Sequence, residues 1–221
     1  MADIQKNILS FKKQLPNRVD LVAVSKTKPK EDILQAYEAG QRIFGENKIQ
    51  EMSQKYEALP KDIEWHMIGH VQRNKVKYMA SYVSLIHGVD SLKLLREINK
   101  QALKNERVID CLLQVHIAQE SSKFGFDINE MTAVFDELTQ NPLPNIRVVG
   151  LMGMASYTSN MVQVESEFLS LKKLFDHFNH TFNLSVLSMG MSGDYQIAIT
   201  CGSNMIRVGS RIFGQRNQVS L

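Results

Sequence analysis

The sequence predicts a single α/β domain built as a (β/α)8 barrel. Eight short runs rich in valine, isoleucine and leucine alternate with segments of helical spacing along the 221 residues. These runs are mostly apolar on both faces, as parallel strands covered by helices must be. Eight strand–helix units favour a closed barrel over the alternative, an open doubly wound sheet. We therefore expect one TIM-like barrel domain over residues 1–221, with an additional N-terminal helix.

The N-terminal segment predicts a lead-in helix within residues 1–16. Apolar residues recur at helical spacing from Ile4 to Leu15, and Pro16 then stops the pattern. The barrel is expected over residues 20–214. Its strands are expected at residues 20–25, 42–44, 63–68, 82–87, 109–117, 145–151, 185–189 and 205–208.

Helices are expected between these strands. Pro29 suits the first turn of one helix and Gly40 its C-terminal cap. Asp127 and Glu130 form a pair resembling a capping box before another helix. Further helices are predicted after residue 47, over 72–80, after residue 91, over 164–178 and over 194–201, and the segment 164–178 has the clearest helical spacing.

Composition argues against several classes of function. The formal net charge is +3, from 26 basic and 23 acidic residues, which is too balanced to indicate binding to nucleic acid or to a membrane surface. The apolar runs are strand-sized, and the N-terminus lacks the apolar core of a signal peptide. The two cysteines, Cys111 and Cys201, do not suggest a disulfide framework. We expect a cytoplasmic protein.

One amine and two glycine-containing loops form the strongest candidate site. Lys26 directly follows a predicted buried strand, at the strand end where barrels carry their chemistry. The loops after the seventh and eighth strands, residues 188–194 and 207–211, often form a phosphate cup in such barrels. Gly190, Gly193 and Gly209 would let the backbone approach an anion, and Ser192 and Ser210 would add hydroxyl donors. The alternatives are ordinary turn residues and a surface lysine.

Histidines near the predicted strand ends raise the alternative of a metal site. His66, His87 and His116 belong to the third, fourth and fifth strands, and His70 follows the third. No carboxylate motif of recognisable spacing accompanies them, so we do not expect a metal.

Six motifs, in order, resemble those of one known family. They are Ala23–Pro29, Phe44–Asn47, Trp65–Lys75, Gly150–Met152, Ser188–Ser192 and Arg207–Gly214. The chain is similar over residues 20–216 to the YggS/PROSC family of pyridoxal 5′-phosphate (PLP) homeostasis proteins. That resemblance implies a barrel like the alanine racemase N-terminal domain, and it implies that PLP is the cofactor.

The resemblance also implies residue roles. Lys26 matches the lysine that forms a covalent aldimine with PLP. Ser192, Gly209 and Ser210 match the phosphate cup. No catalytic residue is implied.

Other positions of the resemblance concern the ring of the cofactor. Arg207 matches the position that faces the pyridine nitrogen in the racemase barrel, and Asn47 matches a polar residue near the ring. Lys48 stands where an aromatic residue is usual, and His116 stands where asparagine is common. We assign no role to Lys48 or His116, nor to His66 and His70.

The resemblance implies a PLP carrier in vitamin B6 homeostasis, and indirectly in amino-acid homeostasis, with PLP-dependent apo-enzymes as possible recipients. Arg207 beside the ring nitrogen would keep the pyridine neutral, because a guanidinium cannot accept a proton. In the two-domain racemases one catalytic base comes from a second domain, and this sequence ends with the barrel. We therefore expect no enzymatic activity, and the resemblance to a racemase barrel without its second domain implies a monomer. The alternatives are a small PLP-dependent amino-acid racemase and a Schiff-base or phosphosugar barrel such as an aldolase.

Overall fold

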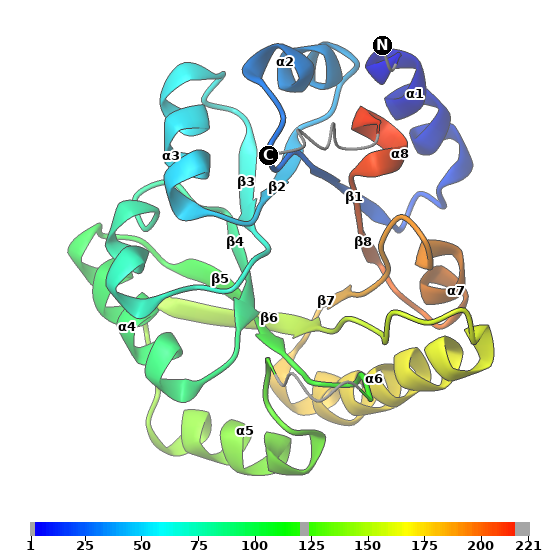
Figure 1. The fold of residues 1–221 in the computed structure, drawn as a ribbon. Coiled ribbons are helices and arrows are strands. Elements are labelled where there is room, and N and C mark those ends of the chain that lie inside the picture. Colours follow the sequence, from blue (N-terminus) through cyan, green and yellow to red (C-terminus); the bar gives the residue numbers. More distant parts are fainter. Residues whose placement is uncertain (1–2, 120–123, 215–221) are drawn as a thin grey trace, which may run out of the picture.

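The computed structural model describes residues 3–119 and 124–214, and these form a closed barrel of eight parallel strands (Figure 1). Each strand pairs with the next along the chain, and β8 pairs with β1 to close the ring. The predicted (β/α)8 barrel is confirmed. The strands are β1 Asp20–Val24, β2 Ile43–Glu46, β3 Glu64–Met67, β4 Leu85–Val89, β5 Ile109–Gln114, β6 Ile146–Met152, β7 Val186–Ser188 and β8 Met205–Val208.

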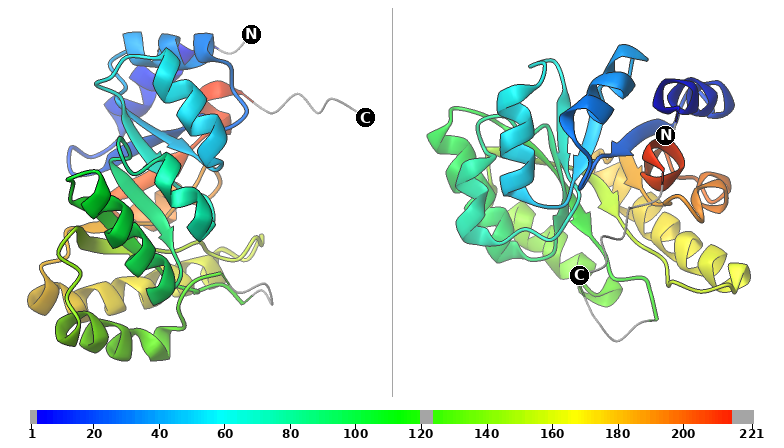
Figure 2. Two further views of the ribbon diagram at one scale, coloured as in Figure 1. Left: turned by 90° about the vertical axis from the view of Figure 1, so that its left-hand side faces the viewer. Right: turned by 45° about the horizontal axis from the view of Figure 1, so that its top comes forward.

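Helices surround the barrel on its outside (Figures 1 and 2). The predicted lead-in helix is α1, Ile4–Gln14, and Asp3 caps it by accepting a hydrogen bond from the backbone N–H of Lys6. The others are α2 Lys30–Glu38, α3 Ile49–Ala58, α4 Leu92–Lys104, α5 Met131–Gln140, α6 Met161–Phe182, α7 Tyr195–Thr200 and α8 Ser210–Phe213, with 3-10 turns η1 Arg73–Tyr78 and η2 Ile128–Glu130.

The apolar core has two parts. The larger part lies between the strands and the helices, where α6 buries the residues that predicted it, Val164, Phe168, Leu171, Phe175 and Phe178. The smaller part fills the barrel interior with Val22, Leu85, Leu112, Met152 and Met205. Polar residues at other inward positions of these strands therefore lie in a largely apolar interior.

Two strands, predicted to end at residues 44 and 87, extend further, and each continues through a glycine. A Cβ at Gly45 would lie 2.9 Å from Val22 Cγ1, so β2 continues past the predicted end through a close approach to β1. A Cβ at Gly88 would lie 2.5 Å from the carbonyl oxygen of Gly69, so β4 likewise runs on to Val89. In both places the missing side chain makes room for a neighbour rather than a turn.

Two helical segments also differ from expectation. The helix predicted over 72–80 is a 3-10 helix, and Val76 is its only buried residue, which gives an α-helix little apolar face to bury. The short helix α8 directly after β8 was not predicted. It is fastened by Asn7 Nδ2, which donates to the carbonyl oxygen of Ile212, and by Lys28 Nζ, which donates to that of Phe213.

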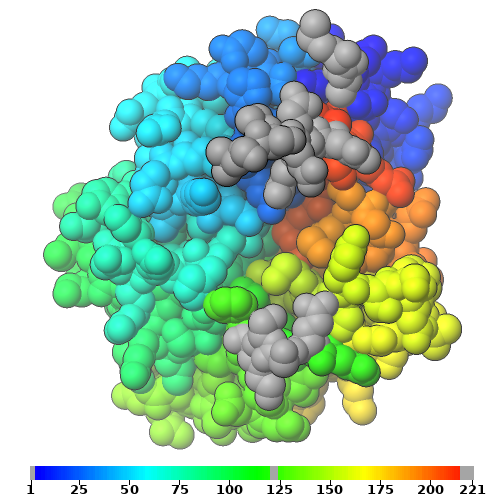
Figure 3. Space-filling view, in the orientation of Figure 1, coloured from blue at the N-terminus to red at the C-terminus, as the bar shows by residue number. Residues whose placement is uncertain are grey.

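The seam of the barrel joins the first and last parts of the chain. In Figure 3 the blue segments lie beside the orange and red ones, as the pairing of β1 with β8 requires. This pairing has four registered residue pairs, whereas β7 and β8 share one, Ser188 with Met205. Over residues 3–119 and 124–214, we find no helix with the length and apolar character of a membrane span.

Candidate functional site

Lys26 lies just beyond the carboxyl end of β1, and both of its neighbours are tied to other elements. The backbone N–H of Ser25 donates to the carbonyl oxygen of Gly45 on β2. Thr27 has a φ of +63°, a left-handed conformation that residues with a Cβ adopt only when surrounding contacts hold them. The chain therefore turns sharply at Lys26, which is half-buried.

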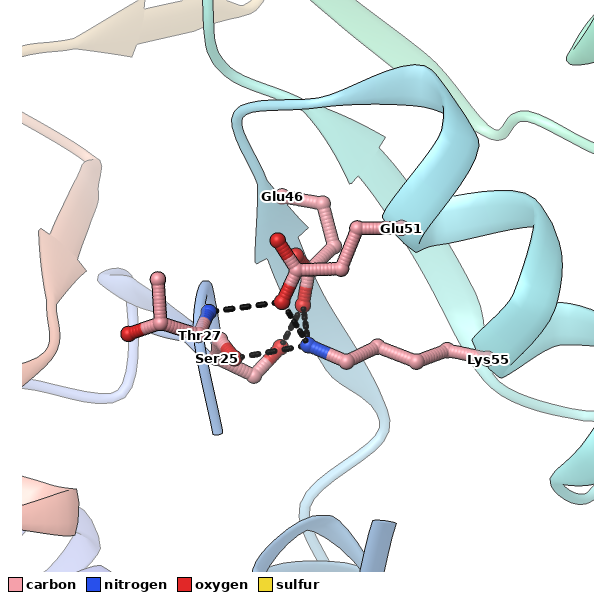
Figure 4. A network of polar contacts seen from close by, with 5 residues as sticks. All are labelled: Ser25, Thr27, Glu46, Glu51 and Lys55. Atoms are coloured by element: carbon pink, nitrogen blue, oxygen red, sulfur yellow. Dashed lines mark hydrogen bonds and ion pairs between the residues drawn. The ribbon is translucent and has the colours of Figure 1, made fainter. Parts of the chain in front are cut away.

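A polar network, the clamp, holds this turn (Figure 4). It consists of Ser25, Thr27, Glu46, Glu51 and Lys55. Glu46 Oε1 accepts hydrogen bonds from Ser25 Oγ at 2.5 Å and from Lys55 Nζ at 2.7 Å. Lys55 Nζ also donates to the carbonyl oxygen of Ser25 at 2.8 Å and to Glu51 Oε1 at 2.7 Å. Glu51 Oε1 accepts from the backbone N–H of Thr27 at 2.6 Å. The backbone is thus held on both sides of Lys26.

The clamp places opposite charges out of water. The side chain of Glu46 is 0% exposed and that of Lys55 is 6% exposed. Burial raises the pKa of Glu46, and the nearby Lys55 ammonium opposes this shift. Glu46 Oε2 has no hydrogen-bond partner in the described part of the chain. Since removing one member of a buried ion pair is costly, the clamp stabilises the turn at Lys26.

The loops after β7 and β8 meet next to β1. A Cβ at Gly209 would lie 3.2 Å from the carbonyl oxygen of Val24, so the end of β8 lies directly against the end of β1. Ser192 Oγ accepts from the backbone N–H of Gly209 at 3.3 Å, which joins the two predicted cup loops. Ser210 is exposed as the first residue of α8. The structure thus brings the three predicted cup residues together beside the strand that carries Lys26.

Arg207 is a buried cation at the carboxyl end of the barrel. Its Nη1 donates to the carbonyl oxygen and the Oγ of Ser188, at 2.9 and 2.6 Å, and its Nη2 donates to the carbonyl oxygen of Gly153 at 3.0 Å. The residue is 4% exposed, and no carboxylate among the described residues forms an ion pair with it. Burial lowers the pKa of Arg207 to about 10, and the Asp194 carboxylate, which forms no ion pair with it, opposes this shift, so the guanidinium remains charged at neutral pH.

A buried guanidinium with no carboxylate in contact is a costly arrangement, and a ligand offsets that cost if it brings negative charge or a strong acceptor. Among the described residues, Ser188 and Gly153 accept from three N–H groups of Arg207, which leaves two donors on the same side chain for a ligand. These donors, the amine of Lys26 and the glycine loops suit a small ligand with a phosphate, an aldehyde and a ring acceptor. The residues present therefore fit the cofactor that the sequence implied.

Beyond Arg207 the polar contacts continue across the barrel. Ser188 Oγ lies 3.1 Å from His87 Nδ1, and His87 Nε2 lies 3.0 Å from His66 Nδ1. Burial lowers the pKa of His66 to about 3 and lowers that of His87 well below its usual value, with His66 and Arg207 adding to the second shift. Both imidazoles are therefore neutral at neutral pH.

The sequence identified these histidines only as possible metal ligands and missed their connection to Arg207. The available signal was polar residues at inward positions of otherwise apolar strands. In residues 3–119 and 124–214 no three His, Cys, Asp or Glu side chains are grouped as metal ligands. His70 Nδ1 instead lies 3.0 Å from Asp90, and the backbone of His116 donates to the carbonyl oxygen of Phe126.

Asn47 lies at the rim of the barrel just after β2. A Cβ at Gly69 would lie 2.5 Å from the carbonyl oxygen of Asn47, so the loops after β2 and β3 are in close contact. Asn47, Lys48 and His70 line the same cavity, and Lys48 is exposed. The structure thus places Asn47 at the carboxyl ends of the strands with the other predicted site residues.

Comparisons with known proteins agree with the barrel fold. The family model "Alanine racemase, N-terminal domain" matches residues 1–217. A pyridoxal phosphate homeostasis protein of Aquifex aeolicus is 40% identical over 203 residues, covering 90% of this chain and 88% of the relative. The structure of PipY from Synechococcus elongatus without PLP is 34% identical with a TM-score of 0.90, covering 96% of this chain and 100% of that one.

Two further solved structures are informative. PipY with PLP bound is 33% identical with a TM-score of 0.86, over the same shares of the two chains. An alanine racemase of Clostridium difficile is 15% identical with a TM-score of 0.80, covering 98% of this chain and 60% of the racemase. At that identity the likeness concerns the fold alone.

Proposed function

The chain belongs to the pyridoxal phosphate homeostasis protein family, and on this premise we propose that it binds PLP at the carboxyl end of the barrel and buffers the free cofactor. The observation that carries the proposal is Arg207, a buried cation without a carboxylate partner among the described residues, one strand away from Lys26. PipY, a relative of the same fold, has been solved with PLP bound. The proposal places the chain in vitamin B6 homeostasis, and indirectly in amino-acid homeostasis.

The proposed roles follow the positions of the side chains. PLP supplies an aldehyde, and the Lys26 amine condenses with it reversibly, losing water and forming a Schiff base (aldimine). Ser192, Gly209 and Ser210 bind the phosphate with hydroxyl and backbone donors. Asn47 lies near the ring. The clamp holds the backbone of Lys26, so the amine is presented from a fixed point.

Arg207 is proposed to donate a hydrogen bond to the ring nitrogen. A guanidinium has donors only, so it stabilises the nitrogen without a proton and weakens the electron-withdrawing power of the ring. This weakening disfavours the chemistry that most PLP enzymes perform. It supports storage and release of the cofactor rather than catalysis, and the relatives are named as homeostasis proteins.

The proposal extends to partners and place. PLP-dependent apo-enzymes are the proposed recipients of the cofactor, and the chain is proposed to act as a cytoplasmic monomer. Light scattering on the purified protein tests the monomer, because a dimer would double the measured mass.

An absorbance titration with PLP tests the function. The wild type should become yellow with a Schiff-base absorption band, and borohydride should fix the cofactor to Lys26. Lys26→Ala should lose the band, whereas Lys30→Ala, a change at an exposed lysine at the start of α2, should keep it. A wild type that stays colourless with PLP contradicts the proposal. Interconversion of amino-acid enantiomers that depends on Lys26 contradicts its non-enzymatic part.

A further inference from the structure

A chain of hydrogen bonds, here the relay, runs through the barrel from Arg207 to its opposite end. It consists of Arg207 on β8, Ser188 on β7, His87 on β4 and His66 on β3. Strands β4 and β7 are separated by β5 and β6 on one side of the ring, so the contact between His87 and Ser188 crosses the interior. Every member is 4% exposed or less.

The hydrogen bonds of the relay can be donated in only one direction, away from Arg207. Arg207 can only donate, so Ser188 Oγ accepts its hydrogen bond and uses its own hydrogen toward His87 Nδ1. His87 is neutral, so its Nε2 carries the hydrogen and donates to His66 Nδ1. His66 then carries its hydrogen on Nε2. The opposite direction would leave the Ser188 hydroxyl hydrogen without an acceptor among the described residues.

Carboxylates near His66, at the far end of the relay, favour this direction. His66 lines a cavity of about 470 Å³ at the amino ends of the strands. Asp20 and Glu64 line the same cavity, as do Asp110 and Arg147, which form an ion pair with each other. With the direction given above, each N–H or O–H points away from the Arg207 cation and toward the end with carboxylates. Dipoles aligned in this way strengthen one another in an interior of low dielectric constant.

We infer that Ser188, His87 and His66 are positioning residues for Arg207, which hold its guanidinium in one orientation toward the cofactor ring. The inference rests on the proposed function, because Arg207 acts only on a bound cofactor. Without the relay, Arg207 keeps its bonds to the carbonyl oxygens of Ser188 and Gly153, so it stays in place but gains rotational freedom. Loss of the relay should therefore change the spectrum and affinity of bound PLP more than the fold.

The direction of the relay can be measured without PLP. In protein labelled with ¹⁵N at histidine, long-range proton–nitrogen correlation spectra distinguish the two neutral tautomers from the charged form. At pH 7 both His66 and His87 should be neutral with hydrogen on Nε2. A hydrogen on Nδ1 of His87, or a charged ring, would overturn the inference.

Substitutions test the effect on the cofactor. His87→Met removes both hydrogen bonds at similar volume, and Ser188→Ala removes the link to Arg207. Each should weaken PLP binding about tenfold and shift the absorption band of the bound cofactor. His87→Gln keeps one acceptor and one donor and should restore most of the wild-type behaviour. Cys111→Ala, a buried change in the outer core, is the matched control and should leave the band in place.

The outcomes separate the inference from the proposed function. A wild type that does not bind PLP refutes the function. The inference alone is refuted if the wild type binds PLP and the folded variants Ser188→Ala and His87→Met bind it equally well with an unshifted absorption band. Addition of PLP should also move the ¹⁵N signal of His66, although this residue lies at the far end of the relay. An unmoved signal counts against the inference.

Discussion

Replacing Lys55 by methionine should destabilise the protein more than any surface charge change. The Lys55 ammonium makes three hydrogen bonds in the clamp, to Glu46, Glu51 and the carbonyl oxygen of Ser25. Methionine fills a similar volume but leaves Glu46 as a buried carboxylate without its cation. Removing one partner of a buried ion pair costs about 3–5 kcal/mol.

The cost of Lys55→Met should depend on pH. Burial already raises the pKa of Glu46 above that of the unfolded chain, and loss of Lys55 raises it further. A raised pKa in the folded state means that stability is greatest below the unfolded value and falls as pH rises through the folded value. The loss of stability should therefore be larger at pH 8 than at pH 5, where Glu46 binds a proton more readily.

Urea unfolding at the two pH values measures this prediction, and thermal unfolding gives a second reading. For a chain of this size the expected drop in the melting temperature is roughly 6–20 °C. Lys172→Met is the matched control, because Lys172 forms an exposed i,i+4 pair with Asp176, and its loss should cost about 0.5 kcal/mol or less. The double variant Lys55→Met with Glu46→Gln should recover much of the loss. A cost for Lys55→Met below about 1 kcal/mol, equal at both pH values, would refute this account of the clamp.

Three further predictions follow from the packing and from the relay. Gly150→Ala should prevent folding or lower the free energy of unfolding by more than about 3 kcal/mol, because its Cβ would lie 1.8 Å from the carbonyl oxygen of Val186. The control Gly193→Ala places its Cβ where no atom lies within 4 Å and should be neutral in thermal unfolding. A soluble, stable Gly150→Ala contradicts this prediction. Gly209→Ala should weaken PLP retention in a dialysis assay about tenfold and lower stability by about 1 kcal/mol, because its Cβ would lie 3.2 Å from the carbonyl oxygen of Val24. Unchanged retention would show that the phosphate cup lies elsewhere. The lowered pKa values of His66 and His87 mean that the unfolded chain binds protons that the folded chain does not, so stability should fall as pH drops from 6.5 toward 3. His87→Gln should reduce the slope of unfolding free energy against pH, measured by urea unfolding, by about 1.4 kcal/mol per pH unit. An unchanged slope would mean that His87 is charged in the folded state.

The fold and the position of Lys26 after β1 were accessible from sequence because local patterns determine them. Short apolar runs predicted the strands, since a parallel strand covered by a helix must be apolar, and helical spacing predicted the helices between them. Lys26 and the loop of Gly209 were identified by their order relative to those strands. The ends of β2 and β4 were predicted too early, because Gly45 and Gly88 make room for Val22 and Gly69, which belong to other segments of the chain.

The clamp and the relay were not accessible in this way. Glu46 and Lys55 resemble the charged residues of any helix and strand end until folding buries them together. His87 and Ser188 are 101 residues apart, and only closure of the barrel brings them within 3.1 Å. Such contacts depend on register and on strand order around the ring, which a pattern within one segment does not contain.

The seam between β1 and β8 has a consequence for protein synthesis. Lys26 leaves the ribosome early, but Arg207 and Gly209 are among the last residues of the described barrel, and β8 has a single registered pair with β7. A nascent or truncated chain that lacks β8 therefore has Lys26 but lacks Arg207 and Gly209. Since a ligand stabilises the state that binds it, PLP bound as proposed, between β1 and β8, would favour the closed barrel. Retention of PLP would then report that the barrel has closed through β8.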